Sequence, residues 1–138
     1  MVALIGAGQF GETFIRQCRR ISGMQISFVC DLQPERARAA LLAAGYDKSA
    51  FVSVGSNEEA ATALNNGQII ITADYRLISG LPLDCVVEAT GSPEAAAQVG
   101  QITLMSGFHL VMITKEADIV VGPYLHKLAK AAGRHVTP

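Results

Sequence analysis

Apolar residues along the chain fall into short unbroken runs that alternate with segments of helical periodicity. The unbroken runs predict strands at residues 2–5, 24–31, 68–74, 84–90 and 108–114. Runs of this length and composition are typical of strands buried on both faces of a parallel sheet. We therefore expect most of the sheet to be covered on both sides.

The segments between these runs predict helices. Phe10, Phe14 and Cys18 recur at helical spacing, which favours an amphipathic helix from about Gln9 to Ile21. Further helices are expected at residues 34–44, 57–65, 93–106 and 123–132, with proline starts, a Ser56–Glu59 capping box and glycine stops. The final residues, RHVTP, read as the beginning of a sixth strand.

Strands that alternate with helices indicate an α/β fold with a doubly wound, mostly parallel sheet in three α/β/α layers. A chain of 138 residues is expected to form one domain, residues 1–138. Right-handed crossovers would bring the first glycine turn, the 89–92 loop and the 114–118 loop to the carboxyl ends of the strands. Ligands bind at this edge in such sheets.

Charge and hydropathy exclude several classes of partner. The chain has 11 Lys and Arg against 12 Asp and Glu, a net charge of -1, so it lacks the basic surface that binds nucleic acid or anionic lipid. The longest strongly apolar run, residues 108–113, is too short to cross a membrane. We expect neither nucleic acid nor membrane as a partner.

The cysteines and histidines indicate neither a disulfide framework nor a metal site. Cys18, Cys30 and Cys85 are odd in number, lie far apart and form no CxxC pair, so buried packing is expected for them. The histidines have no ligand spacing, and no metal is expected. With no targeting segment in view, a reducing, cytoplasmic location is the default expectation.

A glycine pattern, GAGQFG, follows the first predicted strand and opens the first predicted helix. Gly6 permits a tight turn, Gly8 lets the backbone approach a pyrophosphate, and Gly11 lets the helix pack closely on the strand. The amides of Gln9, Phe10 and Gly11 would offer N–H donors and the positive helix end to that phosphate. The alternative is a strand-to-helix turn that binds nothing.

Asp31 ends the second predicted strand about 20 residues after Gly11, where dinucleotide-binding folds place an acidic residue. A carboxylate there can accept hydrogen bonds from both ribose hydroxyls of the adenosine half, and it repels a 2′-phosphate. No arginine follows Asp31 directly, although Arg36 on the next helix could swing back. We expect NAD as the cofactor, with NADP as the alternative; the other interpretation of Asp31 is a solvated loop acid.

The stretch EATGSPE places a turn of small residues, Ala89, Thr90, Gly91 and Ser92, after the fourth predicted strand. Bulky side chains there would collide with the nicotinamide ribose, whereas Thr90 or Ser92 could hydrogen-bond to it. Ser92 would also cap the following helix, which begins with Pro93. The two roles are compatible.

Lys115 follows the fifth predicted strand on the ligand side of the sheet. A lysine there could orient a substrate carboxylate or carbonyl, or transfer a proton to or from an alcohol. Lysine is mostly a surface residue, so an exposed side chain without a function is the alternative. We take Lys115 as the candidate catalytic residue.

Three motifs, LIGAGQFG, VVEATGSPEAAA and HLVMITKEADIVVGPYLHKLAKAAG, resemble the N-terminal domain of homoserine dehydrogenase-like oxidoreductases. The last motif is far more specific than the glycine pattern, and the resemblance covers essentially the whole chain. The resemblance is greatest to the branch that carries a C-terminal SAF domain and includes a reductoisomerase-like enzyme of isoprenoid precursor synthesis.

The resemblance implies a Rossmann-type NAD(P)-binding domain. Its cofactor surface would comprise Gly6, Gly8–Gly11, Asp31, Ala89–Ser92 and Thr114. Homoserine dehydrogenases have an Asn-Lys pair after this strand, so Lys115 matches and Thr114 does not. These families continue into a substrate-binding and catalytic domain, and we therefore expect the chain to be part of a longer enzyme and to lack turnover by itself.

The implied reaction is hydride transfer between nicotinamide and the carbonyl or alcohol carbon of a small-molecule substrate. A cofactor domain of a sugar-phosphate reductoisomerase-like enzyme and a non-catalytic nucleotide-sensing module stay open as alternatives. The apolar composition and the sheet edge at residues 135–138 favour assembly into a homo-oligomer.

Overall fold

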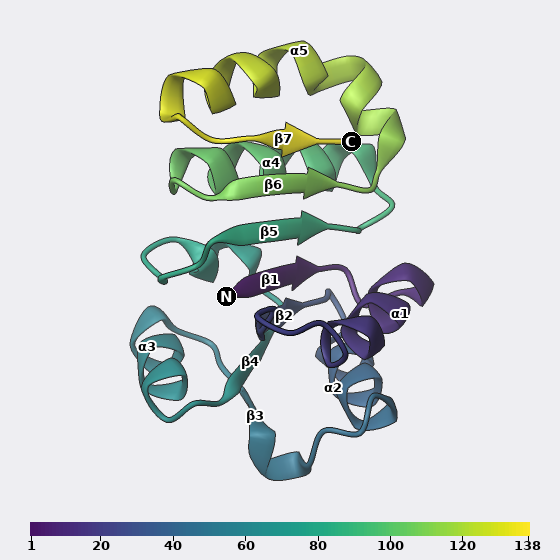
Figure 1. The fold of residues 1–138 in the computed structure, drawn as a ribbon, viewed down its shortest axis with the longest axis vertical. Coiled ribbons are helices and arrows are strands. Elements are labelled where there is room, and N and C mark those ends of the chain that lie inside the picture. Colours follow the sequence, from purple (N-terminus) through teal and green to yellow (C-terminus); the bar gives the residue numbers. More distant parts are fainter.

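The computed structural model describes all 138 residues, in which strands and helices alternate (Figure 1). The strands are β1 (Val2–Ile5), β2 (Ile26–Cys30), β3 (Phe51–Ser53), β4 (Ile69–Thr72), β5 (Cys85–Glu88), β6 (His109–Met112) and β7 (Val136–Thr137). The helices are α1 (Gln9–Cys18), α2 (Pro34–Ala43), α3 (Asn57–Asn65), α4 (Pro93–Met105) and α5 (Lys115–Ala132), with short 3-10 turns η1 (Lys48–Ala50) and η2 (Tyr75–Ile78).

All seven strands pair in parallel in the order β3-β4-β2-β1-β5-β6-β7. Every residue of β2 and of β4 is buried, as the unbroken apolar runs predict. From β1 the chain winds through β2 to one edge of the sheet, and from β5 it winds to the other. The doubly wound parallel sheet is confirmed, and its switch point lies between β1 and β5.

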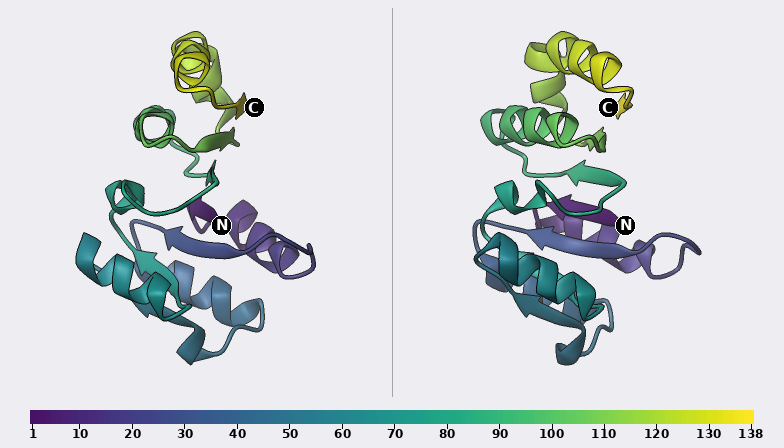
Figure 2. Two further views of the ribbon diagram at one scale, coloured as in Figure 1. Left: turned by 60° about the vertical axis from the view of Figure 1, so that its left-hand side comes forward. Right: turned by 90° about the vertical axis from the view of Figure 1, so that its left-hand side faces the viewer.

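Helices cover both faces of the sheet (Figure 2). Buried residues of α1 and α2 form one apolar cluster with the strands, and buried residues of α3, η2 and α4 form another on the opposite face. Helix α5 packs beside α4 over β6 and β7. Because all the strands run parallel, their carboxyl ends lie at one edge of the sheet.

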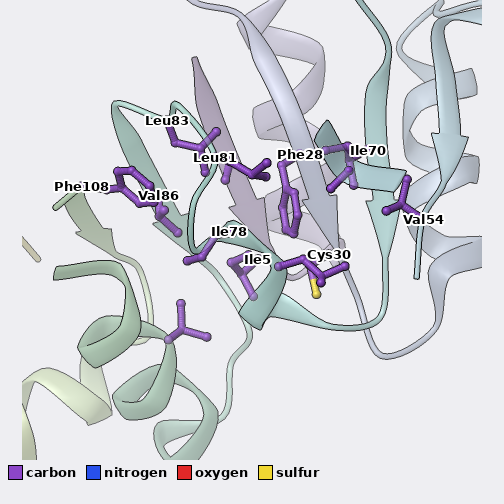
Figure 3. Packing of buried hydrophobic residues seen from close by; sticks show 14 of the residues in the cluster. Ile5, Phe28, Cys30, Val54, Ile70, Ile78, Leu81, Leu83, Val86 and Phe108 are labelled. Atoms are coloured by element: carbon purple, nitrogen blue, oxygen red, sulfur yellow. The ribbon is translucent and has the colours of Figure 1, made fainter. Parts of the chain in front are cut away.

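The larger of these clusters lies between the centre of the sheet and the η2 segment. Figure 3 shows Ile5, Phe28 and Cys30 on neighbouring strands, with Ile78 of η2 close to them. Removing one such side chain from water contributes about 1.5–3 kcal/mol, so the cluster fixes the strand ends firmly. One of its members, Cys30, is the last residue of β2 and adjoins Asp31.

Helix ends follow the predicted signals. The Ser56 hydroxyl accepts the Glu59 N–H (3.2 Å), and the Ser92 hydroxyl accepts the Ala95 N–H (3.3 Å). Gly133 ends α5 with a left-handed φ of 66°, a conformation that glycine adopts without steric cost.

No helix combines the length and hydropathy needed to cross a membrane.

The predicted start of the last helix is wrong. Helix α5 begins at Lys115 rather than Pro123, so residues 115–118 form a helical turn and not a loop. Proline is favoured in a first turn, but Pro123 lies inside this helix on its exposed side. The first turns of α5 lie at an angle to the rest of the helix in Figure 1, as a proline kink requires.

Three short elements have no counterpart in the predictions, the 3-10 turn η1, the edge strand β3 and the 3-10 turn η2. Each contains only three or four residues, too few for a period to be recognised. The predicted final strand is present as β7.

Cys18 and Cys30 are buried, Cys85 is half-buried, and all three thiols are free.

Burial raises the pKa of the Cys30 thiol from 9.0 to about 12, with smaller contributions from the charges of Asp31 and Asp74. The unfolded chain therefore loses this proton near pH 9, whereas the folded chain retains it until about pH 12. The contribution of the buried Cys30 thiol to the free energy of unfolding is complete below pH 9. It declines above pH 9, by up to about 1.4 kcal/mol per pH unit. We expect the stability advantage of wild type over Cys30→Ala to narrow as pH rises.

Urea unfolding of both proteins at about pH 8 and about pH 10.5 measures this difference. A difference in unfolding free energy that is the same at the two pH values would contradict the expectation.

Candidate functional site

The first turn, between β1 and α1, depends on two glycines. Gly6 has a φ of 105°, and a Cβ there would lie 2.4 Å from the Ala89 carbonyl oxygen. A Cβ at Gly11 would lie 2.2 Å from the Gly6 carbonyl oxygen. Since no protein atom could be accommodated at these distances, the packing of β1 against β5 and of α1 against β1 requires glycine at both positions.

Gly8 differs from these two glycines. A Cβ at Gly8 would have no atom within 4 Å, so the protein's own packing does not require glycine there. The residue is exposed and lies at the N-cap of α1, where no side chain caps the helix. Backbone bonding begins with the Glu12 N–H, which donates to the Gly8 carbonyl (2.9 Å). The preceding helix amides thus stand without a side-chain acceptor beside open space.

Asp31 joins two loops at the end of β2. Its Oδ2 accepts the Ala7 N–H and its Oδ1 accepts the Gln33 N–H, both at 2.8 Å. The side chain is half-buried at the place where the sequence predicted it. Since a carboxylate has about four acceptor positions, two remain for a ligand.

A pocket of about 290 Å³ opens beside Asp31, at the carboxyl ends of β1, β2, β4 and β5. Its wall is largely apolar and includes Leu32, which is 91% exposed, and Tyr75. The lining residues are Ile5, Gly6, Cys30, Asp31, Leu32, Gln33, Arg36, Ala73, Tyr75, Thr90, Ser92, Ala95 and Val99. The size and lining suit a flat, mostly apolar ligand group.

Tyr75 is a lining residue that the sequence reasoning missed. Its hydroxyl donates to Gln98 Oε1 (2.9 Å), which ties η2 to α4 across the outer wall of the pocket. The signal for it would have been an aromatic residue just beyond a predicted strand, but only the order of the sheet brings that strand next to β2.

Glu88, the last residue of β5, is a second residue that the sequence reasoning missed. It is fully buried, and it is the only charged residue among the buried ones. Its Oε1 accepts the Thr90 N–H and hydroxyl (both 2.7 Å) and the Thr114 hydroxyl (2.8 Å), and its Oε2 accepts the Thr114 N–H (3.2 Å). A lone charge in an otherwise apolar run, CVVE, was the available signal.

The 89–92 turn therefore rests on internal polar contacts. The Gly91 N–H donates to the Thr114 hydroxyl oxygen (3.1 Å), while Ser92 caps α4 and lines the pocket. The hydroxyls of Thr90 and Thr114 both donate to Glu88, and each also accepts a backbone N–H, from Ser92 (3.2 Å) and Gly91 respectively, so the N–H groups of the turn are satisfied within the protein. The predicted helix-capping role of Ser92 is confirmed.

Lys115 is the first residue of α5, directly after the Thr114 N-cap, and its side chain is exposed. It forms no salt bridge with any carboxylate of the chain. A cation in the first turn of a helix is unfavourable by about 0.3–1 kcal/mol, so Lys115 does not stabilise α5. Its catalytic role stays a prediction.

Four of the predicted residues, Gly6, Asp31, Thr90 and Ser92, line the same pocket. Of the others, Ala89 packs on Gly6 and Gly91 donates to Thr114, while Gly8–Gly11 form the start of α1, which the bond from Ala7 joins to Asp31, and Lys115 begins α5. No group of three or more His, Cys, Asp or Glu side chains is arranged to hold a metal ion. The carboxyl edge thus combines an apolar pocket, a carboxylate and free helix amides.

The chain matches one protein-family model, the homoserine dehydrogenase NAD-binding domain, over residues 6–137. No curated protein sequence matches it. Among solved structures, it resembles a homoserine dehydrogenase from Thiobacillus denitrificans with 19% identity and a TM-score of 0.72, covering 99% of this chain and 28% of that one.

Two further structures were determined with a nicotinamide cofactor. An oxidoreductase from Agrobacterium radiobacter in complex with NAD+, L-tartaric acid and magnesium has 15% identity and a TM-score of 0.72 over 98% of this chain and 33% of that one. A myo-inositol dehydrogenase from Lactobacillus casei in complex with NAD(H) and myo-inositol has 16% identity and a TM-score of 0.70 over 98% and 35%.

The chain spans about a third of the length of these structures, which share its fold. The family match over nearly the whole chain agrees with the doubly wound sheet and with the glycine turn at its switch point. The chain therefore belongs to the family of homoserine dehydrogenase NAD-binding domains, the NAD-binding part of dehydrogenase-like oxidoreductases.

Proposed function

We propose that this domain binds NAD in preference to NADP, across the carboxyl edge of the sheet. The observation that carries the proposal is the position of Asp31, which is bonded to the glycine turn and lines the apolar pocket while two of its acceptor positions remain. Pyrophosphate would lie at the start of α1, the adenosine half in the pocket, and the nicotinamide half at the 89–92 turn.

The start of α1 fits a pyrophosphate for three physical reasons. The amides of Gln9, Phe10 and Gly11 lack a side-chain cap, and the helix dipole favours negative charge at this end. The absence of a side chain at Gly8 leaves room for the phosphate oxygens to approach the backbone. Helices α3 and α4, by contrast, are capped by Ser56 and Ser92.

The pocket fits the adenosine half. The two remaining acceptor positions of Asp31 would bond the ribose hydroxyls, and Leu32 and Tyr75 would enclose the adenine ring. A 2′-phosphate would place a dianion beside the Asp31 carboxylate, which is unfavourable. Arg36 also lines the pocket and is the one cation available to an NADP phosphate.

In the longer enzyme, the bound nicotinamide would supply hydride transfer to or from a carbonyl or alcohol carbon. The 89–92 turn would orient the nicotinamide end, and Thr90, Ser92 and the N-cap residue Thr114 would contribute their backbone and remaining acceptors. Lys115, exposed at the same edge, would bind a carboxylate or carbonyl of the substrate or move a proton at its hydroxyl. The three free cysteines of the chain would suit a reducing compartment such as the cytoplasm.

Calorimetric titration of the chain with NAD, NADP and AMP tests the cofactor preference. We expect NAD to bind at least about tenfold more tightly than NADP, and Asp31→Asn to lower NAD affinity about tenfold, because charge-assisted bonds to the ribose are lost. The control, Asp47→Asn, removes an exposed carboxylate outside the pocket and should bind NAD as wild type does. Tighter binding of NADP by the wild-type chain would overturn the preference.

Gly8→Ala tests the pyrophosphate position. The added methyl meets no protein atom, so the fold should persist with a stability loss of at most about 1 kcal/mol, while NAD affinity falls about tenfold because the methyl occupies the phosphate approach. Gly55→Ala is the matched control, since Gly55 is also open and lies away from the site. Equal NAD affinity in Gly8→Ala and Gly55→Ala would place the pyrophosphate elsewhere.

Lys115→Met in the complete enzyme tests the catalytic role. We expect turnover to fall at least about 100-fold, with NAD affinity changed less than about twofold, because the lysine acts on substrate rather than cofactor. Lys127→Met removes an exposed lysine further along α5 and serves as the control. Wild-type turnover in Lys115→Met would identify Lys115 as an ordinary surface residue, and a complete protein that binds NAD without any turnover would support the nucleotide-sensing alternative.

A further inference from the structure

Glu88 is surrounded entirely by hydrogen-bond donors. Two backbone N–H groups and two hydroxyls, from Thr90 and Thr114, point at its two oxygens, and no group requires a proton from it. A carboxylate, which only accepts, matches this set. A glutamine would turn its amide hydrogens toward at least one of these donors.

Stability alone does not account for a carboxylate at this position. Burying a carboxylate is costly even when it is well bonded, and a well-packed apolar side chain of similar volume is often equally stabilising. What an apolar residue could not do is hold two separate loops by directed bonds. The position of Glu88 in the fold shows which two loops these are.

The two loops lie on neighbouring strands. Thr90 belongs to the turn that follows β5, and Thr114 is the N-cap of α5, which follows β6. The strand ladder ends here with the Ile113 N–H, which donates to the Glu88 carbonyl (2.9 Å). Beyond that bond, side-chain contacts of Glu88 and Thr114 hold the two loops together, including the Gly91 N–H bond to Thr114.

We infer that Glu88 is a positioning residue that fixes the 89–92 turn against the start of α5 and thereby sets the nicotinamide end of the site. Glu88 is fully buried, so it acts through Thr90 and Thr114 and does not touch the cofactor. This role rests on the proposed binding of NAD. The start of α1 and the Asp31 side of the adenosine pocket are held by other contacts, those of Asp31, Gly6 and Gly11, while Thr90 and Ser92 line the β5 side of that pocket.

The division of the site gives a specific test with two ligands, NAD and ADP, which lacks both the nicotinamide ring and its ribose. Glu88→Gln should weaken NAD at least about fivefold and change ADP affinity less than about twofold, because the nicotinamide end loses its order while the start of α1 and Asp31 keep theirs. Thr114→Val should also weaken NAD binding, whereas Thr114→Ser, which keeps the hydroxyl, should bind NAD as the wild type does. Calorimetry of the 138-residue chain measures all four proteins.

Two controls separate positioning from general loss of stability. Thr103→Val replaces a buried threonine whose hydroxyl has no partner and should bind both ligands as wild type does. Ile26→Ala destabilises the core at the amino end of β2, away from the site, and should leave the ratio of the two affinities unchanged. Hydrogen exchange at the Thr90 and Thr114 amides should accelerate in Glu88→Gln and not in Thr103→Val.

The outcomes are distinct. A wild-type chain that binds neither ligand would refute the proposed function and with it this role. The role of Glu88 alone would be refuted if the wild-type chain binds NAD but Glu88→Gln and Thr114→Val weaken the affinities for both ligands equally, or weaken neither. Equal affinity of the wild-type chain for NAD and ADP would refute it as well, because the nicotinamide end would then contribute nothing to binding. If Glu88→Gln does not fold, the comparison of Thr114→Val with Thr114→Ser decides the result.

Discussion

The close approach of backbone at the switch point of the sheet is the constraint on which the rest of this domain depends. At Gly6 and Gly11, a single methyl group would overlap a carbonyl oxygen, so β1, β5 and α1 can meet only where side chains are absent. This contact brings the end of the first strand beside the turn that follows β5. Every loop at the carboxyl edge takes its position from it, because the strands that carry these loops pair outward from β1 and β5.

Hydrogen bonds to two carboxylates also hold the loops around this contact in place. Asp31 holds the glycine turn from the β2 side, and Glu88 holds the opposite side through Thr90 and Thr114. Both carboxylates bind backbone N–H groups that parallel strand pairing leaves free at strand ends. They differ in access: Asp31 is half-buried and can still accept bonds from a ligand, whereas Glu88 has no contact with solvent. One carboxylate is suited to recognition, and the other is suited to support.

The sequence was informative where structure is local and less so where it depends on neighbours in space. Apolar runs, glycine stops and serine caps act within a few residues, and they predicted the parallel sheet, the glycine turn and Asp31. The start of α5 was misjudged because Pro123 satisfies a local preference that the upstream helical turns override. Tyr75 and Glu88 were missed because their partners, Gln98 and Thr114, are brought to them only by strand order.

The bond between the Asp31 carboxylate and the Ala7 N–H has a consequence for how this family can diverge. The same group would both choose the cofactor and hold the turn that receives its phosphates. A lineage that exchanged Asp31 for a residue without an acceptor oxygen, to admit a phosphorylated ribose, would loosen the glycine turn at the same step. A second change that restored an acceptor for Ala7 would then have to accompany the first, so a change of cofactor preference at this position would require either paired substitutions or a neutral residue that keeps the acceptor.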